Sequence, residues 1–436
     1  MATTTTTPLP AGIPSTHPAV VITAPRAPLS ILQRPTEPPG PGEALVHIEW
    51  TSSTPLDLHQ ADGSLLIDPP HVGGSSFGGT VLALGPVDAN STTAAAAHSK
   101  LSVGDQVFGM AWRESRERGF QTFITAPTYL MSKLPKGTTM QEAVTVSTNL
   151  VTVLHTFTKD LELEMPQWFV DSSPSSSNAK KHTSKGDKGD KKQWILVWGA
   201  ASSVGQYALQ VLKNWGYRNV IAVASKRHHQ DLLTLGAAVC FDYAQEDVTD
   251  LIRSHVVAAA AASSASSSSP DNDAAIPLVL DCIGSLEGSL RPLTRLAEKG
   301  TKVAVMLPVI NKHATEDEPP EYEMDATKVL EGEWKDGVVL RGVRTHHYTY
   351  NEFMKNHAQP DIVPALLEQG VVKPNKQRIV EGATLLERAT NALKILRDRA
   401  QSGEKLVWRV DEKSARELFP DLLVSKADPT KAGTII

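Results

Sequence analysis

Short hydrophobic runs separated by glycine and proline dominate the first third of the chain. Apolar runs at 19–24 and 43–50 flank the Pro/Gly-rich segment 35–42, and that punctuation marks turns between strands. Further glycine-bounded runs lie at 79–85, 105–109 and 119–125. Closely spaced short strands are typical of a barrel-like antiparallel domain. The pattern therefore predicts a β-rich N-terminal domain.

The period of the hydrophobic positions changes after residue 140. A helix is predicted at 141–154, and from Trp194 to Tyr348 buried strand runs alternate with amphipathic helices. This alternation is the pattern of a parallel, doubly wound sheet. The six predicted strands are 195–198, 220–224, 238–241, 278–281, 303–307 and 337–343.

The segment after Tyr348 contains helical patterns at 361–369 and 385–400 and a final apolar strand at 405–410. These elements need a packing partner, and we expect it to be the N-terminal domain. The predicted fold class is α/β, a β-rich domain plus a doubly wound parallel-sheet domain. The expected division is a disordered lead (1–18), the first part of the β-rich domain (19–154), the parallel-sheet domain (155–347) and a C-terminal return to the β-rich domain (348–436).

Low-complexity segments interrupt the parallel-sheet domain. A tract rich in Ser, Lys, Gly and Asp near 170–192 has too little apolar surface to fold. An Ala/Ser tract near 258–275 and an acidic loop at 315–325 are predicted to be excursions on the surface.

Composition narrows the class of partner. The formal charge of −5, from 43 basic and 48 acidic residues, provides no broad basic field for nucleic acid or an anionic membrane. Cys240 and Cys282 are far apart, so we expect neither a disulfide framework nor a cysteine-rich zinc cluster. The chain begins without a targeting pattern and has no apolar run of 18 residues. A soluble, cytoplasmic protein is expected.

A glycine turn follows the predicted strand 195–198. Small residues let backbone amides approach a pyrophosphate, and the helix after the turn adds orphan N–H groups and its positive dipole end. The turn predicts the opening of a nucleotide-binding Rossmann unit, although Ser202 stands where the usual fingerprint has its middle glycine. A tight turn without ligand is the alternative. The candidate contacts are Gly199, Ala201, Ser202, Ser203, Val204 and Gly205.

The second strand indicates which nucleotide is bound. An acid at its end would bind the ribose hydroxyls of NAD, whereas basic and hydroxyl groups accommodate the phosphate of NADP. Here 220–224 leads into Ser225, Lys226 and Arg227, with no acid. These side chains favour NADPH over NADH. The alternative is that the two basic residues only begin a solvated helix.

Six segments of the chain carry a resemblance to a known family, at 70–81, 103–109, 195–206, 235–243, 281–284 and 402–407. In this order they resemble the medium-chain dehydrogenase/reductase superfamily, specifically its zinc-free quinone oxidoreductase and trans-enoyl reductase-like branch. Fungal members, including partner enoyl reductases of polyketide synthases, share the Ser-Ser-Val-Gly form of the turn.

The resemblance implies a GroES-like N-terminal domain, an inserted NADP-binding domain and an active site in the cleft between them. It implies that Thr152 lies near the nicotinamide and that Tyr243 lies beside the adenosine phosphate. It also implies that strand ends follow the nicotinamide ribose, at Ile283, Gly284, Met306 and Leu307. Asp57 is a second catalytic candidate because the loop after Trp50 should border the nicotinamide; capping of a helix near Pro55 is an equal alternative.

Zinc-dependent relatives carry a cysteine in the first active-site loop, a Gly-His-Glu triplet and a four-cysteine lobe. This chain has hydroxyl residues at 52–54 and Gly-Ser-Ser at 74–76. Hydroxyls do not supply the thiolate and imidazole ligands that zinc needs, so no metal is predicted. His59 and His71 are interpreted as packing or hydrogen-bonding residues rather than ligands.

Without a metal to polarise a carbonyl, reduction of an activated C=C bond is the easier chemistry. The leading hypothesis is an NADPH-dependent, zinc-independent oxidoreductase that reduces an enone or enoyl substrate. Two alternatives stay open, an NADPH quinone oxidoreductase and a catalytically weak nucleotide-binding partner subunit. The resemblance leaves two assemblies open, a homodimer and an association with a biosynthetic synthase.

Overall fold

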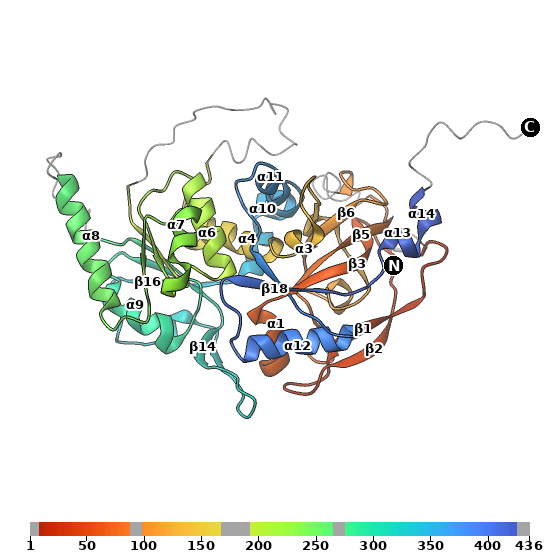
Figure 1. Ribbon diagram of the computed structural model, residues 1–436, viewed down its shortest axis with the longest axis horizontal. Helices are drawn as coiled ribbons and strands as arrows, with labels where there is room; N and C mark the ends of the chain where they lie inside the picture. Colours follow the sequence, from red (N-terminus) through yellow and green to blue (C-terminus); the bar gives the residue numbers. More distant parts are fainter. Residues whose placement is uncertain (1–7, 88–97, 167–191, 265–274, 425–436) are drawn as a thin grey trace, which may run out of the picture.

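The computed structural model describes residues 8–87, 98–166, 192–264 and 275–424. Residues 1–7 of the predicted lead, 170–191 of the first insertion and 265–274 of the Ala/Ser tract lie outside the described residues. Figure 1 shows two halves side by side, with the parallel-sheet half in green and cyan and the N-terminal half in red and orange. Blue C-terminal elements run back to the N-terminal half.

A seven-stranded sheet forms the core of the N-terminal half. Its order is β17-β18-β3-β5-β6-β8, with β7 also paired to β3. The strands are β3 (Glu43–Ser53), β5 (Ser76–Leu84), β6 (Gln106–Met110), β7 (Phe123–Pro127), β8 (Met131–Lys133), β17 (Lys376–Ile379) and β18 (Glu404–Arg409). A smaller antiparallel sheet has the order β2-β1-β4, from β1 (Thr16–Ile22), β2 (Ser30–Pro35) and β4 (His71–Val72).

The C-terminal segment is part of this half. Strand β18 pairs antiparallel with β3, with Leu406 opposite Ser53, and helix α12 (Leu385–Arg397) packs against α1 (Pro55–Gly63). Trp408 on β18 is fully buried, its ring lies 4.6 Å from Phe120, and its Nε1 donates to Ser53 Oγ at 2.9 Å. Residues more than 350 positions apart thus share one core.

The second half contains a six-stranded parallel sheet in the order β11-β10-β9-β12-β13-β16. Its strands are β9 (Ile195–Trp198), β10 (Val220–Val223), β11 (Val239–Phe241), β12 (Leu278–Asp281), β13 (Lys302–Met306) and β16 (Val339–Val343). All six lie at predicted positions. Strands β9, β10 and β12 are apolar and buried along their whole length because both faces of the sheet are covered there, whereas the edge strand β16 carries the exposed Arg341.

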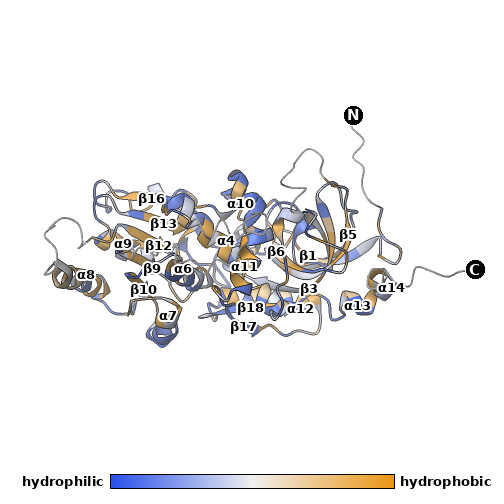
Figure 2. Cartoon of the chain, turned by 90° about the horizontal axis from the view of Figure 1, so that it is seen from above, coloured by the Kyte–Doolittle hydropathy of each residue, from blue (hydrophilic) through white to orange (hydrophobic). Residues whose placement is uncertain are grey.

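Successive side chains of these strands enter two different cores. Ile195 and Val197 pack with α6 (Ser203–Asn214), whereas Leu196 and Trp198 pack with α8 (Val248–Ser264) and α9 (Arg291–Leu296). In Figure 2 this half lies on the left, with its apolar strands between the helices. Other helices of the described chain are α7 (His229–Leu235), α10 (Glu352–His357), α11 (Val363–Glu368), α13 (Ala415–Leu418) and α14 (Pro420–Val424).

The helix predicted at 141–154 is broken in two. The structure has α3 (Met140–Ala143) and α4 (Ser147–His155), and α4 continues into a π-helical turn at Thr156–Asp160. Ser52 Oγ donates to the Val144 carbonyl at 2.8 Å. This tertiary hydrogen bond occupies a carbonyl that would otherwise accept within a continuous helix, so the strand neighbour sets the break.

Two predicted surface excursions contain regular structure instead. Helix α8 continues through Ser264, because alanine has the highest helix propensity and lengthens the amphipathic helix before it. Part of the acidic loop forms β15 (Glu321–Glu323), which pairs antiparallel with β14 (Val309–Lys312). Within the described ranges, no helix is long and apolar enough to cross a membrane.

We predict that Trp408→Ala lowers the free energy of unfolding by about 3 to 5 kcal/mol, because it removes a fully buried indole from the core of the N-terminal half. Ser53→Ala, which keeps the indole but removes the acceptor of its N–H, should cost about 1 to 3 kcal/mol. Urea unfolding followed by tryptophan fluorescence and circular dichroism measures both. A loss below 1 kcal/mol for Trp408→Ala would show that β18 is dispensable to this core.

Candidate functional site

The carboxyl ends of β9, β10, β12 and β13 meet at one edge of the parallel sheet. The strand order is the 3-2-1-4-5-6 order of doubly wound nucleotide-binding sheets, with the chain reversing direction of travel between β9 and β12. Ligands of such sheets bind in the crevice at that reversal. The structure therefore brings the predicted turn, the end of the second strand and the ends of the fourth and fifth strands together.

The first turn of the crevice requires glycine at its start. Gly199 has φ +75°, and a Cβ there would lie 2.5 Å from the side chain of Ile283. The N–H groups of Gly199 and Ala200 donate to the Val223 carbonyl at 2.9 and 3.0 Å, which fastens the turn to β10. The turn and the Asp281–Gly284 segment thus approach closely across the reversal point.

Ser202, the departure from the usual fingerprint, is the N-cap of α6. Its hydroxyl accepts from the Gly205 N–H at 3.1 Å, as serine does at helix starts. Gly205 is needed for packing, because a Cβ there would lie 2.6 Å from Ala200 Cα. The N–H groups of Ser203 and Val204 have no partner in the described part of the chain. Two donors at the positive end of a 12-residue helix are a suitable site for phosphate.

Asp281 shapes the opposite side of the crevice. One carboxylate oxygen accepts from the Ile283 N–H at 2.9 Å, and the other accepts from the Gly284 N–H at 3.2 Å and from Ser289 Oγ at 2.8 Å. Burial raises the pKa of Asp281 to about 6, while the three hydrogen bonds act in the opposite direction. The side chain holds Ile283 and Gly284 in place beside the glycine turn.

The end of β10 presents a hydroxyl pair and two cations. Ser225 Oγ donates to Tyr243 Oη at 3.1 Å, and Tyr243, after β11, is 53% exposed. Lys226 and Arg227 are exposed, and Lys226 has no ion pair or hydrogen bond among the described side chains. The Arg227 Nε donates to His228, which is itself hydrogen-bonded to Ser402 Oγ at 2.8 Å. All four residues predicted for the adenosine end therefore lie together.

The end of β13 lies next to the Asp281–Gly284 turn. Met306 and Leu307 are half-buried, and a Cβ on Gly284 would lie 2.4 Å from the Met306 carbonyl oxygen. Ile310, two residues after Pro308, donates its N–H to the Gly284 carbonyl at 2.6 Å. The predicted ribose contacts of both strands are thus adjacent.

Thr152, predicted to lie near the nicotinamide, comes from α4 and is buried. Its Oγ1 donates to the Thr148 carbonyl at 2.8 Å and lies 2.9 Å from Oγ1 of Thr345, just after β16. The hydroxyl of Thr152 is therefore positioned by its own helix α4, which precedes the parallel sheet in sequence, and by the segment that follows β16, the last strand of that sheet.

Asp57 is the N3 residue of α1 and caps its start. One carboxylate oxygen accepts from the Thr54 N–H at 2.7 Å, and the other, Oδ1, is buried without a hydrogen-bond partner in the described chain. Burial raises the pKa of Asp57, and the nearby cations Arg118 and Lys405 lower it. Burial lowers the pKa of Lys405 to about 8. The geometry fits the capping alternative, and a catalytic role for Asp57 stays a prediction.

The first-loop hydroxyls are bonded to one another. Ser52 Oγ lies 2.8 Å from Ser76 Oγ, and Thr148 Oγ1 donates to the Ser75 carbonyl at 3.2 Å. His59 is hydrogen-bonded to Tyr322 and His71 lies 3.3 Å from Ser115 Oγ, so both have hydrogen-bonding partners as predicted. The described residues contain no group of three His, Cys, Asp or Glu side chains placed to hold a metal ion.

Several residues of the site were not predicted. Thr345 and Tyr322 occur in no motif, and only the fold brings them to the contact between the two halves. Arg118 also occurs in no motif, and the fold buries it beside α1, where it donates to Gln60. Lys405 belongs to the segment 402–407, and its position after a glycine at the start of an apolar strand was the available signal.

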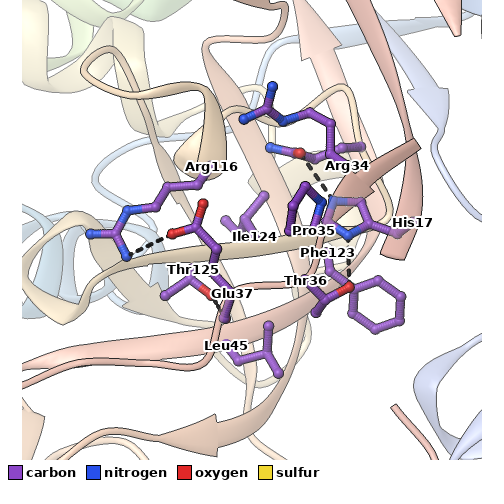
Figure 3. A pocket seen from close by; sticks show the side chains of 11 residues that line it. His17, Arg34, Pro35, Thr36, Glu37, Leu45, Arg116, Phe123, Ile124 and Thr125 are labelled. Atoms are coloured by element: carbon purple, nitrogen blue, oxygen red, sulfur yellow. Dashed lines mark hydrogen bonds and ion pairs between the residues drawn. The ribbon is translucent and has the colours of Figure 1, made fainter. Parts of the chain in front are cut away.

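A hollow elsewhere in the N-terminal half is filled by its own polar contacts (Figure 3). His17 bonds to Thr36 Oγ1 at 2.9 Å and to Gln121 Oε1 at 3.0 Å, and Arg116 forms an ion pair with Glu37 at 3.6 Å. The remaining space is about 10 Å³, which is the size of one water. This hollow is not a substrate site.

The pKa of Asp281 gives a test of the crevice. Because it is about 6 in the folded protein and 3.8 without burial, the folded state binds more protons between these values. The free energy of unfolding should therefore fall by about 3 kcal/mol, relative to Asp281→Asn, as the pH rises through that window, and stay constant above it.

Urea unfolding of both proteins between about pH 4 and about pH 7 measures this difference, with Asp317→Asn, at an exposed position, as the control. A relative stability that rises with pH would contradict the prediction, since it would mean that the hydrogen bonds outweigh burial.

Comparison with known proteins agrees with this arrangement. The model of the alcohol dehydrogenase GroES-like domain matches residues 40–156. Trans-enoyl reductase tndF of Aspergillus flavipes is 31% identical over 244 residues, which are 55% of this chain and 63% of that relative, so the match spans less than two thirds of the relative's length. Trans-enoyl reductase FMN2 of Fusarium mangiferae is 26% identical over 86% of this chain and 93% of its own.

Solved structures share the fold along nearly the whole chain. An alcohol dehydrogenase superfamily protein from Novosphingobium aromaticivorans superposes with a TM-score of 0.64 at 20% identity, covering 91% of this chain and 100% of its own. A mycobacterial protein solved in complex with NADPH superposes with a TM-score of 0.58 at 22% identity, with the same coverage. The chain thus contains a GroES-like domain, is similar to fungal trans-enoyl reductases and shares its fold with an alcohol dehydrogenase superfamily protein, which supports its resemblance to the medium-chain dehydrogenase/reductase superfamily.

Proposed function

We propose that the protein is an NADPH-dependent, zinc-independent reductase of an activated C=C bond in a small molecule, an enone or an enoyl thioester. The observation that carries the proposal is the group at the end of β10. There Ser225 is hydrogen-bonded to Tyr243, and the exposed Lys226 and Arg227 follow it with no acid in the segment after the strand. Two cations and a hydroxyl pair suit a phosphate monoester. A nicotinamide dinucleotide with a bare ribose would leave them unused.

The residues of the crevice fit the rest of a dinucleotide. Gly199 leaves no room for a side chain beside Ile283, and the free N–H groups of Ser203 and Val204 are available to a pyrophosphate. Ile283 is 39% exposed beside Gly199, where a ribose or a nicotinamide could cover its apolar side chain. The proposed contacts also include Ala201, Ser202, Gly205, Gly284, Met306 and Leu307.

When bound, NADPH supplies the hydride for the β-carbon of the substrate. The chain's own residues would orient the reactants. Thr152, the residue proposed to lie near the nicotinamide, is fixed by its hydrogen bonds with Thr148 and Thr345. As the double bond is reduced, charge develops on the carbonyl oxygen, and hydroxyl or amide donors at the cleft stabilise the enolate. The α-carbon then takes a proton from solvent.

The donors of the first loop support a reaction without zinc. Ser52 and Ser76 bond to each other, and Ser52 also donates to the Val144 carbonyl. Neutral hydroxyls in this network lack the charge and softness of zinc ligands. The relatives named trans-enoyl reductases support the choice of a C=C bond as the substrate group.

The activity is tested with the full-length protein, NADPH and a panel of enones, enoyl thioesters and quinones. The expected result is loss of the reduced-nicotinamide absorbance with at least one enone or enoyl thioester, without added metal and unchanged by a chelator. Turnover of quinones alone would favour the quinone oxidoreductase alternative. Binding of NADPH without turnover of any substrate would favour the nucleotide-binding subunit.

The cofactor preference is tested by Lys226→Glu. We expect it to raise the dissociation constant for NADPH by about tenfold to a hundredfold, because it replaces a charge-assisted contact by repulsion, and to change that for NADH far less. Lys299→Glu makes the same charge change at an exposed position before β13, at the amino ends of the parallel strands and so away from the proposed site. It should change neither the dissociation constant for NADPH nor that for NADH. Equal effects of Lys226→Glu on both nucleotides would remove the argument for a phosphate pocket.

A further inference from the structure

The β14–β15 hairpin connects the two halves of the protein. It leaves the parallel-sheet half after β13 and contacts the N-terminal half through its turn and through β15. In Figure 1 it projects below the sheet, in cyan, beside α1 and α12. No motif in the sequence predicts this hairpin, and the proposed function does not use it.

The root of the hairpin lies at the proposed nicotinamide end of the crevice. Ile310 donates its N–H to the Gly284 carbonyl at 2.6 Å, and Tyr322 is the cross-strand partner of Ile310. Directly opposed residues in antiparallel strands are about 5 Å apart. Tyr322 is therefore one strand spacing from a residue that is hydrogen-bonded to the Asp281–Gly284 turn.

Tyr322 reaches the first helix of the N-terminal half. Its hydroxyl lies 2.7 Å from Nδ1 of His59 on α1, and its ring lies so close to Gly63 that a Cβ there would be 2.6 Å from the ring. Burial lowers the pKa of His59 to about 4, so the imidazole is neutral near pH 7 and the contact is a hydrogen bond between neutral groups. The start of the same helix carries Thr54 and Asp57.

Arg26 holds the turn of the hairpin. Its guanidinium donates to three backbone carbonyls, those of Glu316 at 2.5 Å, Glu318 at 2.8 Å and Thr315 at 3.2 Å. Its own N–H donates to the Ala61 carbonyl at the end of α1, at 2.8 Å. Arg26 has φ +62°, an unfavourable conformation for a residue with a Cβ. One residue thus ties the turn to the same helix that Tyr322 contacts.

A cavity interrupts the packing behind this turn. A cavity of about 210 Å³ lies between the turn, the residues after β1, α1 and α12, and its lining includes Arg26, Leu29, Ala61, Glu316 and Leu393. Asp62 and Arg397, which also line the cavity, form a bidentate ion pair with distances of 2.9 and 2.6 Å. Since the turn has space beneath it, no continuous apolar core holds it in place. The hydrogen bonds of Arg26 and the contacts of Tyr322 with His59 and Gly63 do so instead.

We propose that Arg26 and Tyr322 are positioning residues for the reduction. They fasten the β14–β15 hairpin to α1 and so hold the Gly284 turn of the cofactor crevice at a fixed separation from the Thr54–Asp57 end of α1. The inference rests on the proposed function for its effect on rate. The fastening itself is a property of the protein without cofactor.

The test compares wild type with Tyr322→Phe, Arg26→Ala and Arg26→Gly. Tyr322→Phe keeps the ring against Gly63 and removes only the hydroxyl. Arg26→Gly also removes the strain of the positive φ, so it separates loss of the guanidinium from any backbone effect. The matched control is Glu321→Ala, an exposed residue of the same hairpin with no ion pair or side-chain hydrogen bond among the described residues. Each protein is measured by hydrogen–deuterium exchange of 309–323 and by kcat and KM for substrate and for NADPH.

The expected result is faster exchange of 309–323 and a fall in kcat on the order of tenfold in Tyr322→Phe and both Arg26 variants, with the KM for NADPH nearly unchanged. Glu321→Ala should match wild type. Unchanged exchange in Tyr322→Phe and Arg26→Gly would overturn the fastening, and faster exchange with unchanged kcat would overturn the positioning role. A wild type that turns over no substrate would refute the proposed function instead, while the exchange data would still decide the fastening.

Discussion

The close approach of β9 and β12 is the constraint on which the site depends. The two strands pair in parallel, and the Cys282 N–H donates to the Trp198 carbonyl at 2.9 Å just where both strands end. Gly199 must then pass Ile283 without a side chain, and Asp281 must satisfy the N–H groups of the turn that carries Ile283. The crevice follows from this pairing, because the chain leaves the two strands in opposite directions along the sheet.

The N-terminal half is built from both ends of the chain, and this gives the crevice its second wall. Strand β18 lies between β17 and β3, so the last described strands complete a sheet begun before residue 53. Ser402, in the turn before β18, is hydrogen-bonded to His228 of the parallel-sheet half. Tyr322, on the β14–β15 hairpin, is hydrogen-bonded to His59 on α1. The halves therefore meet through polar contacts between segments distant in sequence and through a shared apolar cluster that includes Phe108, Leu150 and Leu209.

Sequence patterns predicted the elements whose hydrophobic positions are periodic and buried. All six parallel strands, the glycine turn and the Ser225–Lys226–Arg227 segment were found this way because burial on both faces and local turn chemistry leave a clear pattern. Elements decided by tertiary contacts were missed. Ser52 donates to a carbonyl where the helix predicted at 141–154 breaks, and β15 forms within the loop predicted at 315–325 by pairing with β14. Thr345 and Tyr322 were missed for the same reason, since neither belongs to a local motif.

The central claim is that the crevice delivers hydride from NADPH to a carbon–carbon double bond. It is tested most directly by supplying NADPH deuterated at the transferable nicotinamide position, on each face in turn, and analysing the reduced enone or enoyl thioester by mass spectrometry and NMR. The account predicts one deuterium at the β-carbon from only one of the two labelled faces, with the α-hydrogen derived from solvent. A reduced product without deuterium from either face, or deuterium at a carbonyl carbon, would contradict it.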